Sequence, residues 1–308
     1  MSPSDFLIIP FDDWVNVLVR EWLVPNFRPF FRALQVPITM VLNGLNDFFA
    51  FMPMLLTTGI FAAFAYKYAG RGTAIFTILG FAFIDMIGLW PETMTSFSMI
   101  LTSVLFCAVI GIPLGILAAR SDLMWKILRP VLDIMQTIPS FVYLVPIVML
   151  FGVGMAPGII ATIIFALPPI VRLTNLGIRN VRADLIEASE AFGSTPIQML
   201  LDVQLPLAMR TIMAGLNQTL MLALSMVVIA ALIGAGGLGL TVNTGLGRLD
   251  VGQATAGGVG IVILAIVLDR ITQGMGDQGK VQTTSLRQTL ISMFRPGASA
   301  PAATGKTA

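Results

Sequence analysis

The sequence predicts an all-helical integral membrane protein with about seven transmembrane helices. Of its 308 residues, 56% are hydrophobic and only 11% are charged, whereas soluble domains average about 25% charged residues. The charges are also clustered, because no Asp, Glu, Lys or Arg occurs in residues 96–119, 134–171 or 211–247. A helical crossing needs about 20 apolar residues. The first run therefore fits one span, and the two longer runs leave room for more than one span or for re-entry.

Seven spans follow from these runs and from the breaks between them. We expect them at 49–66, 73–90, 96–119, 132–153, 158–178, 210–234 and 253–272. The stretch GVGMAPG at 152–158 should split the long uncharged run into a helical hairpin. Four glycines between 234 and 239 should interrupt the sixth span before a polar loop.

The two ends of the chain differ from the middle. Residues 1–48 should form an amphipathic, non-cytoplasmic tail, residues 49–274 the transmembrane domain, and residues 275–308 a polar cytoplasmic tail. In the N-terminal tail, apolar residues recur at helical spacing opposite charged ones: Phe11, Trp14, Val15, Leu18, Val19 and Trp22 against Asp12, Asp13, Arg20 and Glu21. Such a helix is compatible with a place at the membrane interface and with packing on its own protein.

Basic residues predict the orientation in the membrane, because they are enriched on the cytoplasmic side. With the N-terminus outside and the C-terminus inside, fourteen of the 18 basic residues fall on the cytoplasmic side. The outer side keeps only Arg20, Arg28, Arg32 and Arg248. In this orientation the loop at 183–207 faces the cytoplasm.

Composition also weighs against several function classes. A net charge of +2 gives no indication of nucleic-acid binding, and one cysteine, Cys107, excludes an internal disulfide. The chain has no histidine, so we expect neither a metal site nor the nucleophile–base arrangement of an enzyme. An ion-coupled secondary transporter predicts intramembrane acids or histidines and matched halves. Asp85 is the only acid well inside a predicted span, which makes that class the weaker alternative.

The cytoplasmic loop at 183–207 has the pattern of two short helices. Leu185, Ala188, Ala191 and Phe192 share one face of the first arm. Gly193 suits the left-handed residue that ends a helix. Thr195, Pro196 and Gln198 then match an N-cap, a first-position proline and a capping-box partner, and Pro206 should end the second arm. The apolar face either packs beneath the protein's own spans or fits a groove on a partner.

This stretch, EASEAFGSTPIQMLLDVQLP, resembles the EAA loop of ATP-binding-cassette (ABC) importer permeases. That pattern is EAA, three residues, Gly, nine residues, Ile, one residue, Leu-Pro. The matching positions are Glu187, Ala188, Ser189, Gly193, Val203, Leu205 and Pro206, with Ser189 replacing the second alanine and Val203 the isoleucine. In the family the loop docks on the ATPase subunit, so the resemblance implies that these residues form an ATPase-coupling site.

The resemblance extends over about 95–275. Segments such as LRPVLDIMQTIPSFVYLVPIVMLFGVG and IIFALPPIVRLTNLGI are similar to the permease subunit of bacterial glycine betaine/L-proline importers. This implies a type I permease core of five helices in the bacterial inner membrane. It also implies a second permease copy, two ATPase subunits and a periplasmic or surface-anchored binding protein. An ABC permease for another small solute, such as choline or an amino acid, is the alternative.

The same resemblance implies that the chain is not itself an enzyme. It contains no Walker A pattern, so ATP hydrolysis is expected on the separate ATPase subunit. ATP and magnesium would bind there, and we expect no cofactor on this chain.

Polar residues inside two spans are candidates for the translocation path. They are Gln136, Thr137, Ser140 and Tyr143 in the fourth span, and Asn217, Gln218, Thr219 and Ser225 in the sixth. Polar side chains within a bilayer face a cavity or another helix, so helix–helix hydrogen bonding is the competing interpretation. The tryptophans are better suited to anchoring at the membrane interface than to an aromatic cage.

Overall fold

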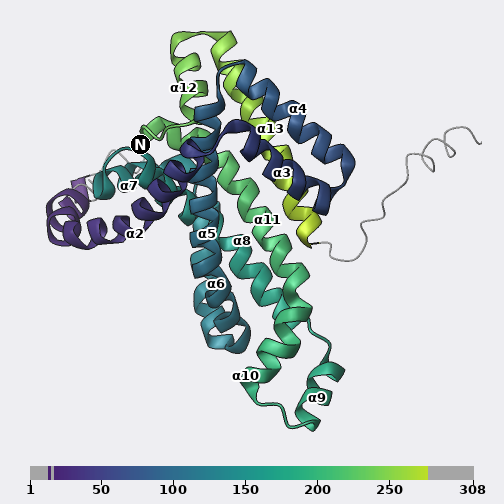
Figure 1. Ribbon diagram of the computed structural model, residues 1–308. Coiled ribbons are helices and arrows are strands. Elements are labelled where there is room, and N and C mark those ends of the chain that lie inside the picture. The colour runs from purple at the N-terminus through teal and green to yellow at the C-terminus, as the bar shows by residue number, and fades with distance from the viewer. Residues whose placement is uncertain (1–12, 15–16, 277–308) are drawn as a thin grey trace, which may run out of the picture.

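The structure, a computed structural model, describes residues 13–14 and 17–276 (Figure 1). Every element assigned in these ranges is helical, which confirms the all-helical fold class. The longer helices are α2 (Val24–Phe51), α3 (Met54–Ala69), α4 (Arg71–Met86), α5 (Trp90–Arg120), α6 (Asp122–Thr137), α8 (Met155–Arg179), α11 (Leu205–Ala230) and α13 (Val251–Gly276). Shorter ones are η2 (Val17–Leu23), η3 (Ser140–Tyr143), α7 (Leu144–Phe151), α9 (Ala183–Ala191), α10 (Pro196–Gln198), η4 (Met199–Gln204), η5 (Ala231–Ile233) and α12 (Leu238–Arg248).

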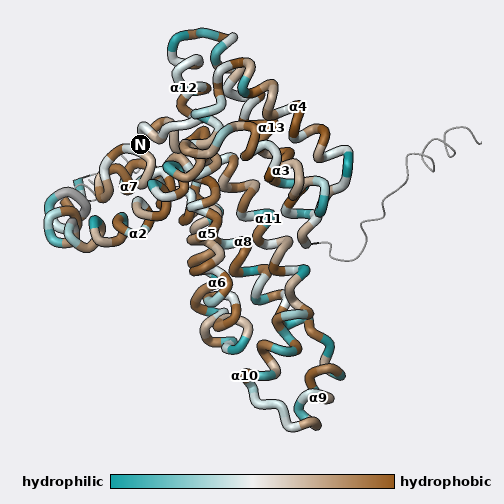
Figure 2. The backbone as a smooth tube through the Cα atoms, viewed as in Figure 1, coloured by the Kyte–Doolittle hydropathy of each residue, from teal (hydrophilic) through white to brown (hydrophobic). Residues whose placement is uncertain are grey.

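Three long helices form the centre of the molecule, with α8 packed along both α5 and α11. Small residues allow this close approach, as is common between membrane helices. Gly111 and Gly115 of α5 lie directly against Ile170 and Thr174 of α8. A second apolar cluster joins α3, α4, α5, α11 and α13, and the rings of Phe61, Phe81 and Phe97 meet edge to face within it. Figure 2 shows the hydrophobic middle of these helices between more hydrophilic ends.

The number of uninterrupted spans is smaller than the seven expected. Among the described residues, four helical segments are long and apolar enough to cross a membrane: 90–120, 155–179, 196–233 and 251–276. Two bent pairs, 29–51 with 54–69 and 122–137 with 140–151, raise the number to six if each pair counts as one span. The expected span at 73–90 corresponds to helix α4. Its 16 residues extend over about 24 Å, less than the length of the about 20 residues that a crossing needs.

Both bends occur at a residue that precedes a proline. Ile138, before Pro139, has ψ 128°, and the flanking helices meet at 102°. Met52, before Pro53, has ψ 126°, and the helices there meet at 108°. The proline ring disfavours helical geometry at the preceding residue. The expected continuous span at 132–153 is therefore wrong, because the helix breaks after Thr137.

The N-terminal tail contains a helix that continues past the expected boundary at residue 48, since α2 ends at Phe51. From Gln35 onward it packs on the protein: Ile38 and Leu42 are buried, and the Gln35 Nε2 atom donates a hydrogen bond to the Phe151 carbonyl oxygen at 2.9 Å. Before Gln35 most of its side chains are exposed, as is Trp22, although the Phe31 ring contacts Phe151. Residues 1–12 and 15–16, the side chains of Val19, Arg20 and Arg28, and residues 277–308 lie outside the described part.

The glycines at 234–239 end the sixth span as expected, but the segment after them is a helix and not the polar loop expected. Gly234 adopts a left-handed conformation with φ 80°. The Leu238 N–H then donates to the Ser96 hydroxyl oxygen at 2.8 Å, and α12 begins there. At the other break, Gly152 and Gly154 separate α7 from α8, which confirms the expected hairpin.

The α12–α13 turn and the loop containing α9 and α10 lie at opposite ends of the molecule (Figure 1), so labelling can test the predicted orientation. A membrane-impermeant maleimide should label Leu249→Cys in intact spheroplasts and Ser194→Cys only after permeabilisation, because basic residues stay inside. The unchanged chain is the control: Cys107 is fully buried and should remain unlabelled. Labelling of Ser194→Cys in intact spheroplasts would reverse the orientation.

Candidate functional site

The loop at 183–207 begins with helix α9, which ends in a well-formed cap. Gly193 has φ 79°, a conformation that glycine adopts at little cost. The Gly193 N–H donates to the Glu190 carbonyl oxygen at 2.9 Å, and the Ser194 N–H donates to the Ser189 carbonyl oxygen at 3.1 Å. These two bonds form a Schellman motif. They confirm the expected helix end and place Gly193 at the tip of the hairpin.

The second arm starts with the predicted capping box. The Thr195 N–H donates to the Gln198 Oε1 atom at 2.9 Å, and the Gln198 N–H donates to the Thr195 hydroxyl oxygen at 3.4 Å. The turn is therefore held by reciprocal bonds between two neighbouring side chains and the backbone.

The sequence predicted that Pro206 would end the second arm, but in the structure it does not. The helix runs from Pro196 to Ile233 without interruption. Residues Met199–Gln204 form a π-helical segment, and the Leu205 N–H bonds to the Leu200 carbonyl oxygen, five residues back. A wider turn of this kind changes the register of the hydrogen bonds. The proline, which has no N–H to place, then lies in the first turn of α11.

The predicted coupling residues lie together on this hairpin, and most are accessible. Glu187, Ala188, Gly193 and Pro206 are exposed, whereas Ser189, Val203 and Leu205 are half-buried. Phe192 is 91% exposed and Ile197 is 64% exposed. Leu200 is buried against the central helices. The protein's own spans therefore anchor the base of the hairpin and leave much of its apolar surface uncovered.

Residues that the sequence analysis missed fix the end of α8, just before the hairpin begins, to α5 and α6. Arg179, in the last turn of α8, pairs with Asp122 at the start of α6 (Nη1–Oδ1 2.7 Å). Its Nη2 atom donates to the Ala118 carbonyl oxygen, and its Nε atom to the Asn175 Oδ1 atom, each at 2.9 Å. The sequence signal was a basic residue in the last turn of a helix, which does not identify its partners.

The four path candidates of the fourth span lie around the bend between α6 and α7. Gln136, Ser140 and Tyr143 are half-buried, and Thr137 is exposed. The Tyr143 hydroxyl group donates to the Met135 carbonyl oxygen, and the Thr137 hydroxyl group to the Ile134 carbonyl oxygen at 3.3 Å. The Met135 carbonyl group, which Pro139 cannot satisfy because it has no N–H, thus finds a partner within this set.

The candidates of the sixth span fall into two groups. The Thr219 hydroxyl group donates to the Ala166 carbonyl oxygen of α8 at 2.9 Å, and the Asn217 Nδ2 atom donates to the Asp269 Oδ1 atom of α13 at 3.1 Å. These two side chains hold helices together. Gln218 and Ser225 lie on an exposed face of α11, and η3 contacts that helix.

Comparison with known proteins gives the family. The family described as "Binding-protein-dependent transport system inner membrane component" matches residues 111–277, which include the hairpin and both groups of path candidates. The chain belongs to this family. It is accordingly a multi-pass protein of the inner membrane and the permease component of an ABC transport system.

Individual relatives extend the match over most of the permease. The glycine betaine/proline betaine transport system permease protein ProW of Escherichia coli (strain K12) is 56% identical over 276 residues, covering 90% of this chain and 78% of the relative. The glycine betaine transport system permease protein OpuAB of Bacillus subtilis (strain 168) is 47% identical, covering 87% and 94%. A solved inward-facing structure of the MetNI methionine ABC transporter matches with a TM-score of 0.53 and 27% identity, covering 63% of the permease and 94% of that chain.

Proposed function

We propose that this chain is the permease subunit of an ATP-driven importer for glycine betaine, proline betaine and related compatible solutes. The observation that carries the proposal is the 56% identity over 90% of the chain to a permease named for these two solutes. More distant relatives are named for carnitine, choline and trimethylamine N-oxide. A methylated nitrogen is common to these compounds, so a different solute of this chemistry is the second candidate cargo.

The hairpin is proposed to be the element that docks on a separate ATPase subunit. A short helix pair with exposed apolar residues and a rigid glycine tip suits insertion into a groove. Exposed Phe192 and Ile197 support this role. The seven coupling residues named above would form the contact, and ATP and magnesium would bind on the partner. A loop can transmit the partner's state only if it binds one arrangement of the ATPases better than the other.

The complete transporter is proposed to contain two copies of this permease, two ATPase subunits and a periplasmic or surface-anchored binding protein. Closure of the ATPases on ATP would bring the two hairpins together and turn the permease pair outward, and hydrolysis would return it inward. Within this arrangement, residues 1–48 are proposed to form a non-cytoplasmic tail, residues 49–274 the permease domain and residues 275–308 a cytoplasmic tail.

The path is proposed to run past the bend after α6 and the exposed face of α11. Its candidate lining residues are Gln136, Thr137, Ser140, Tyr143, Gln218 and Ser225. Thr219 and Asn217 are better explained as contacts between helices, because both bond to a neighbouring helix.

Uptake of labelled glycine betaine at raised osmolarity tests this proposal. The host lacks its own betaine transporters and expresses this chain with a matching ATPase and binding protein. We expect accumulation that requires both partners, with unlabelled proline betaine competing, because all transport energy comes from the ATPase. Omitting the ATPase is the control. Uptake that persists without it would point to an ion-coupled carrier, and accumulation of choline but not betaine would change the cargo.

A further inference from the structure

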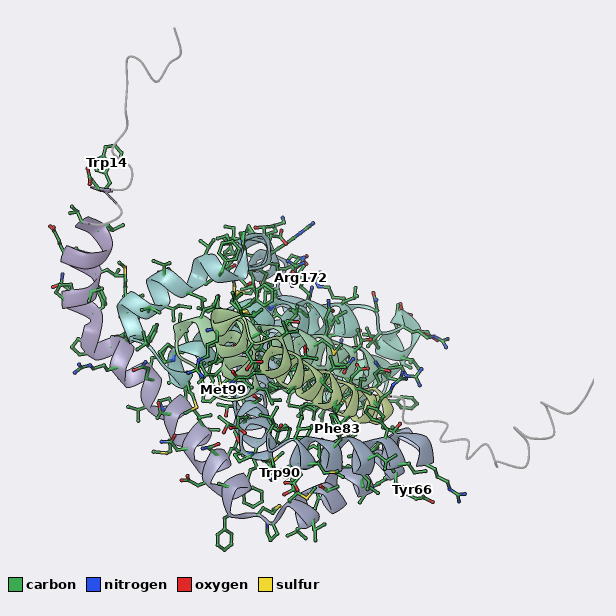
Figure 3. All side chains as sticks on the ribbon, turned by 90° about the horizontal axis from the view of Figure 1, so that it is seen from above. Trp14, Tyr66, Phe83, Trp90, Met99 and Arg172 are labelled. Carbon is green, nitrogen blue, oxygen red and sulfur yellow. The ribbon has the colours of Figure 1, made fainter. Side chains whose placement is uncertain are left out.

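A polar cavity of about 290 Å³ lies between α6 and α8, toward the end of the bundle that carries the hairpin. Its lining contains an indole ring, two guanidinium groups, a carboxylate and an amide: Trp125, Arg129, Asp133, Arg172, Asn175 and Leu176. In the view from above, Arg172 lies on the opposite side of the bundle from Trp90 and Tyr66 (Figure 3). The cavity is therefore remote from the helical pair α3–α4.

An ion pair lies in this cavity and leaves hydrogen-bonding capacity unused. The Arg172 Nη2 atom is 2.6 Å from the Asp133 Oδ1 atom. The Nε atom of Arg172 is buried and has no hydrogen-bond partner among the described residues. That atom has almost no accessible surface and is not available to a ligand. A guanidinium group carries five N–H donors, and Nη2 is the atom bonded to Asp133, so Nη donors remain for a ligand carboxylate. Arg129 supplies a second guanidinium group on the same lining.

The charges restrict the kind of ligand that can enter. An anion that takes Arg172 would leave Asp133 without its partner, and a cation that takes Asp133 would leave Arg172 without its own. The two side chains are 35% and 50% exposed, so separating the pair itself costs little. The larger cost is repulsion between like charges: a lone anion would lie beside the Asp133 carboxylate, and a lone cation beside the Arg172 and Arg129 guanidinium groups. A zwitterion avoids this cost because its carboxylate can replace Asp133 at Arg172 while its positive group stays beside Asp133.

The aromatic residue narrows the ligand further. In contrast to the interface role expected for the tryptophans, Trp125 contributes its indole ring to the lining, and indole faces attract quaternary ammonium groups. We propose that this cavity is a binding site for a zwitterion with a methylated ammonium group and a carboxylate, of which glycine betaine is the simplest example. This inference rests on the proposed cargo and adds a specific site to it.

The position of the site suggests where in transport it acts. Arg129, Asp133 and Gln136 follow one another at spacings of four and three residues on α6, so they share one face of the helix. That face leads from the cavity to the bend that carries the candidate path residues. With the predicted orientation, the cavity is a polar site near the cytoplasmic end of the bundle, where an imported zwitterion would bind before release.

Direct binding tests the site on the purified permease–ATPase complex without its binding protein. Labelled glycine betaine should bind saturably, and Arg172→Gln and Trp125→Leu should each weaken its affinity at least 10-fold. Trp125→Phe should retain most of the affinity, because it keeps an aromatic face. Lys126→Gln is the matched control: it removes a cation from the same helix at an exposed position outside the lining and should bind as the wild type does. Equal melting temperatures would show that the variants are folded.

Competition separates a zwitterion site from a site for either charge alone. Acetate and tetramethylammonium, each carrying one half of the charge pattern, should displace glycine betaine at least 10-fold less well than unlabelled betaine. Asp133→Asn should weaken betaine binding. If it instead strengthens acetate binding and leaves betaine unchanged, the cavity is a simple anion site and the inference is wrong.

The binding experiment tests the site separately from the transported solute, because uptake of glycine betaine is measured in its own experiment. Betaine uptake without measurable binding, or binding that ignores Arg172→Gln and Trp125→Leu, would overturn the site and leave the cargo standing. Absence of both uptake and binding would overturn the two together. Saturable binding that is lost in both variants supports the site.

Discussion

Gly193→Asp should abolish uptake while the permease remains folded. Gly193 lies at the tip of the hairpin with φ 79°, and a Cβ atom added there would meet nothing within 4 Å. Aspartate is among the few residues that tolerate this left-handed conformation, so the chain itself should accept it. A charged side chain within the proposed docking surface should be disruptive, because altering an interface hot spot costs about 2 kcal/mol or more, equivalent to roughly 30-fold in affinity.

The measurement combines betaine uptake with co-purification of the ATPase subunit. Gly88→Asp is the matched control, since Gly88 has φ 74° and equally open surroundings but lies in the turn between α4 and α5, outside the hairpin. We expect the control to transport and to retain the ATPase. If Gly193→Asp does the same, the hairpin is not the coupling element.

Gly115→Leu should prevent stable folding of the permease. A Cβ atom at this position would lie 2.5 Å from the Thr174 Cβ atom and 2.8 Å from the Val171 carbonyl oxygen. The second of these is a backbone atom of α8 and cannot move aside without separating the two central helices. Forcing extra methylenes into a packed core costs about 1–3 kcal/mol, occasionally more, and we expect the upper end here.

The effect is read from the melting temperature and the yield of monodisperse protein in detergent. Gly59→Leu makes the same change in α3, where the added Cβ atom has no neighbour within 4 Å and the residue is exposed. It should leave both quantities near the wild-type values. Equal melting temperatures for the two variants would contradict the close contact between α5 and α8.

Several features of the hairpin could be predicted from the sequence because they depend on neighbours only a few residues apart. The Thr195–Gln198 capping box and the left-handed Gly193 are examples, and both appear as expected. The glycines at 152 and 154 are another, since each has a positive φ angle at the break between helices. In these cases the residue type and its immediate context are sufficient to specify the backbone.

The same local rules failed at prolines, because a helix can either break at a proline or continue through it. Pro206 follows a π-helical segment and the helix continues, whereas the chain breaks before Pro139. Leu200, buried among the central helices, shows how packing fixes the path of the chain ahead of Pro206. The sequence shows where a proline lies, but the free energy of packing around it decides whether the helix breaks or continues there.

The sequence by itself determined the membrane class, the helical content and the position of the hairpin. Each follows from composition or from spacing within about 20 residues. Only the tertiary structure decided which polar side chains bridge helices, as Thr219 does with Ala166, and which remain available, as Gln218 does. It also placed Arg172 beside Asp133, which are 39 residues apart in the chain. Such pairs depend on how helices pack against one another. Helical periodicity shows on which face of a helix a residue lies, but not which residues that face contacts.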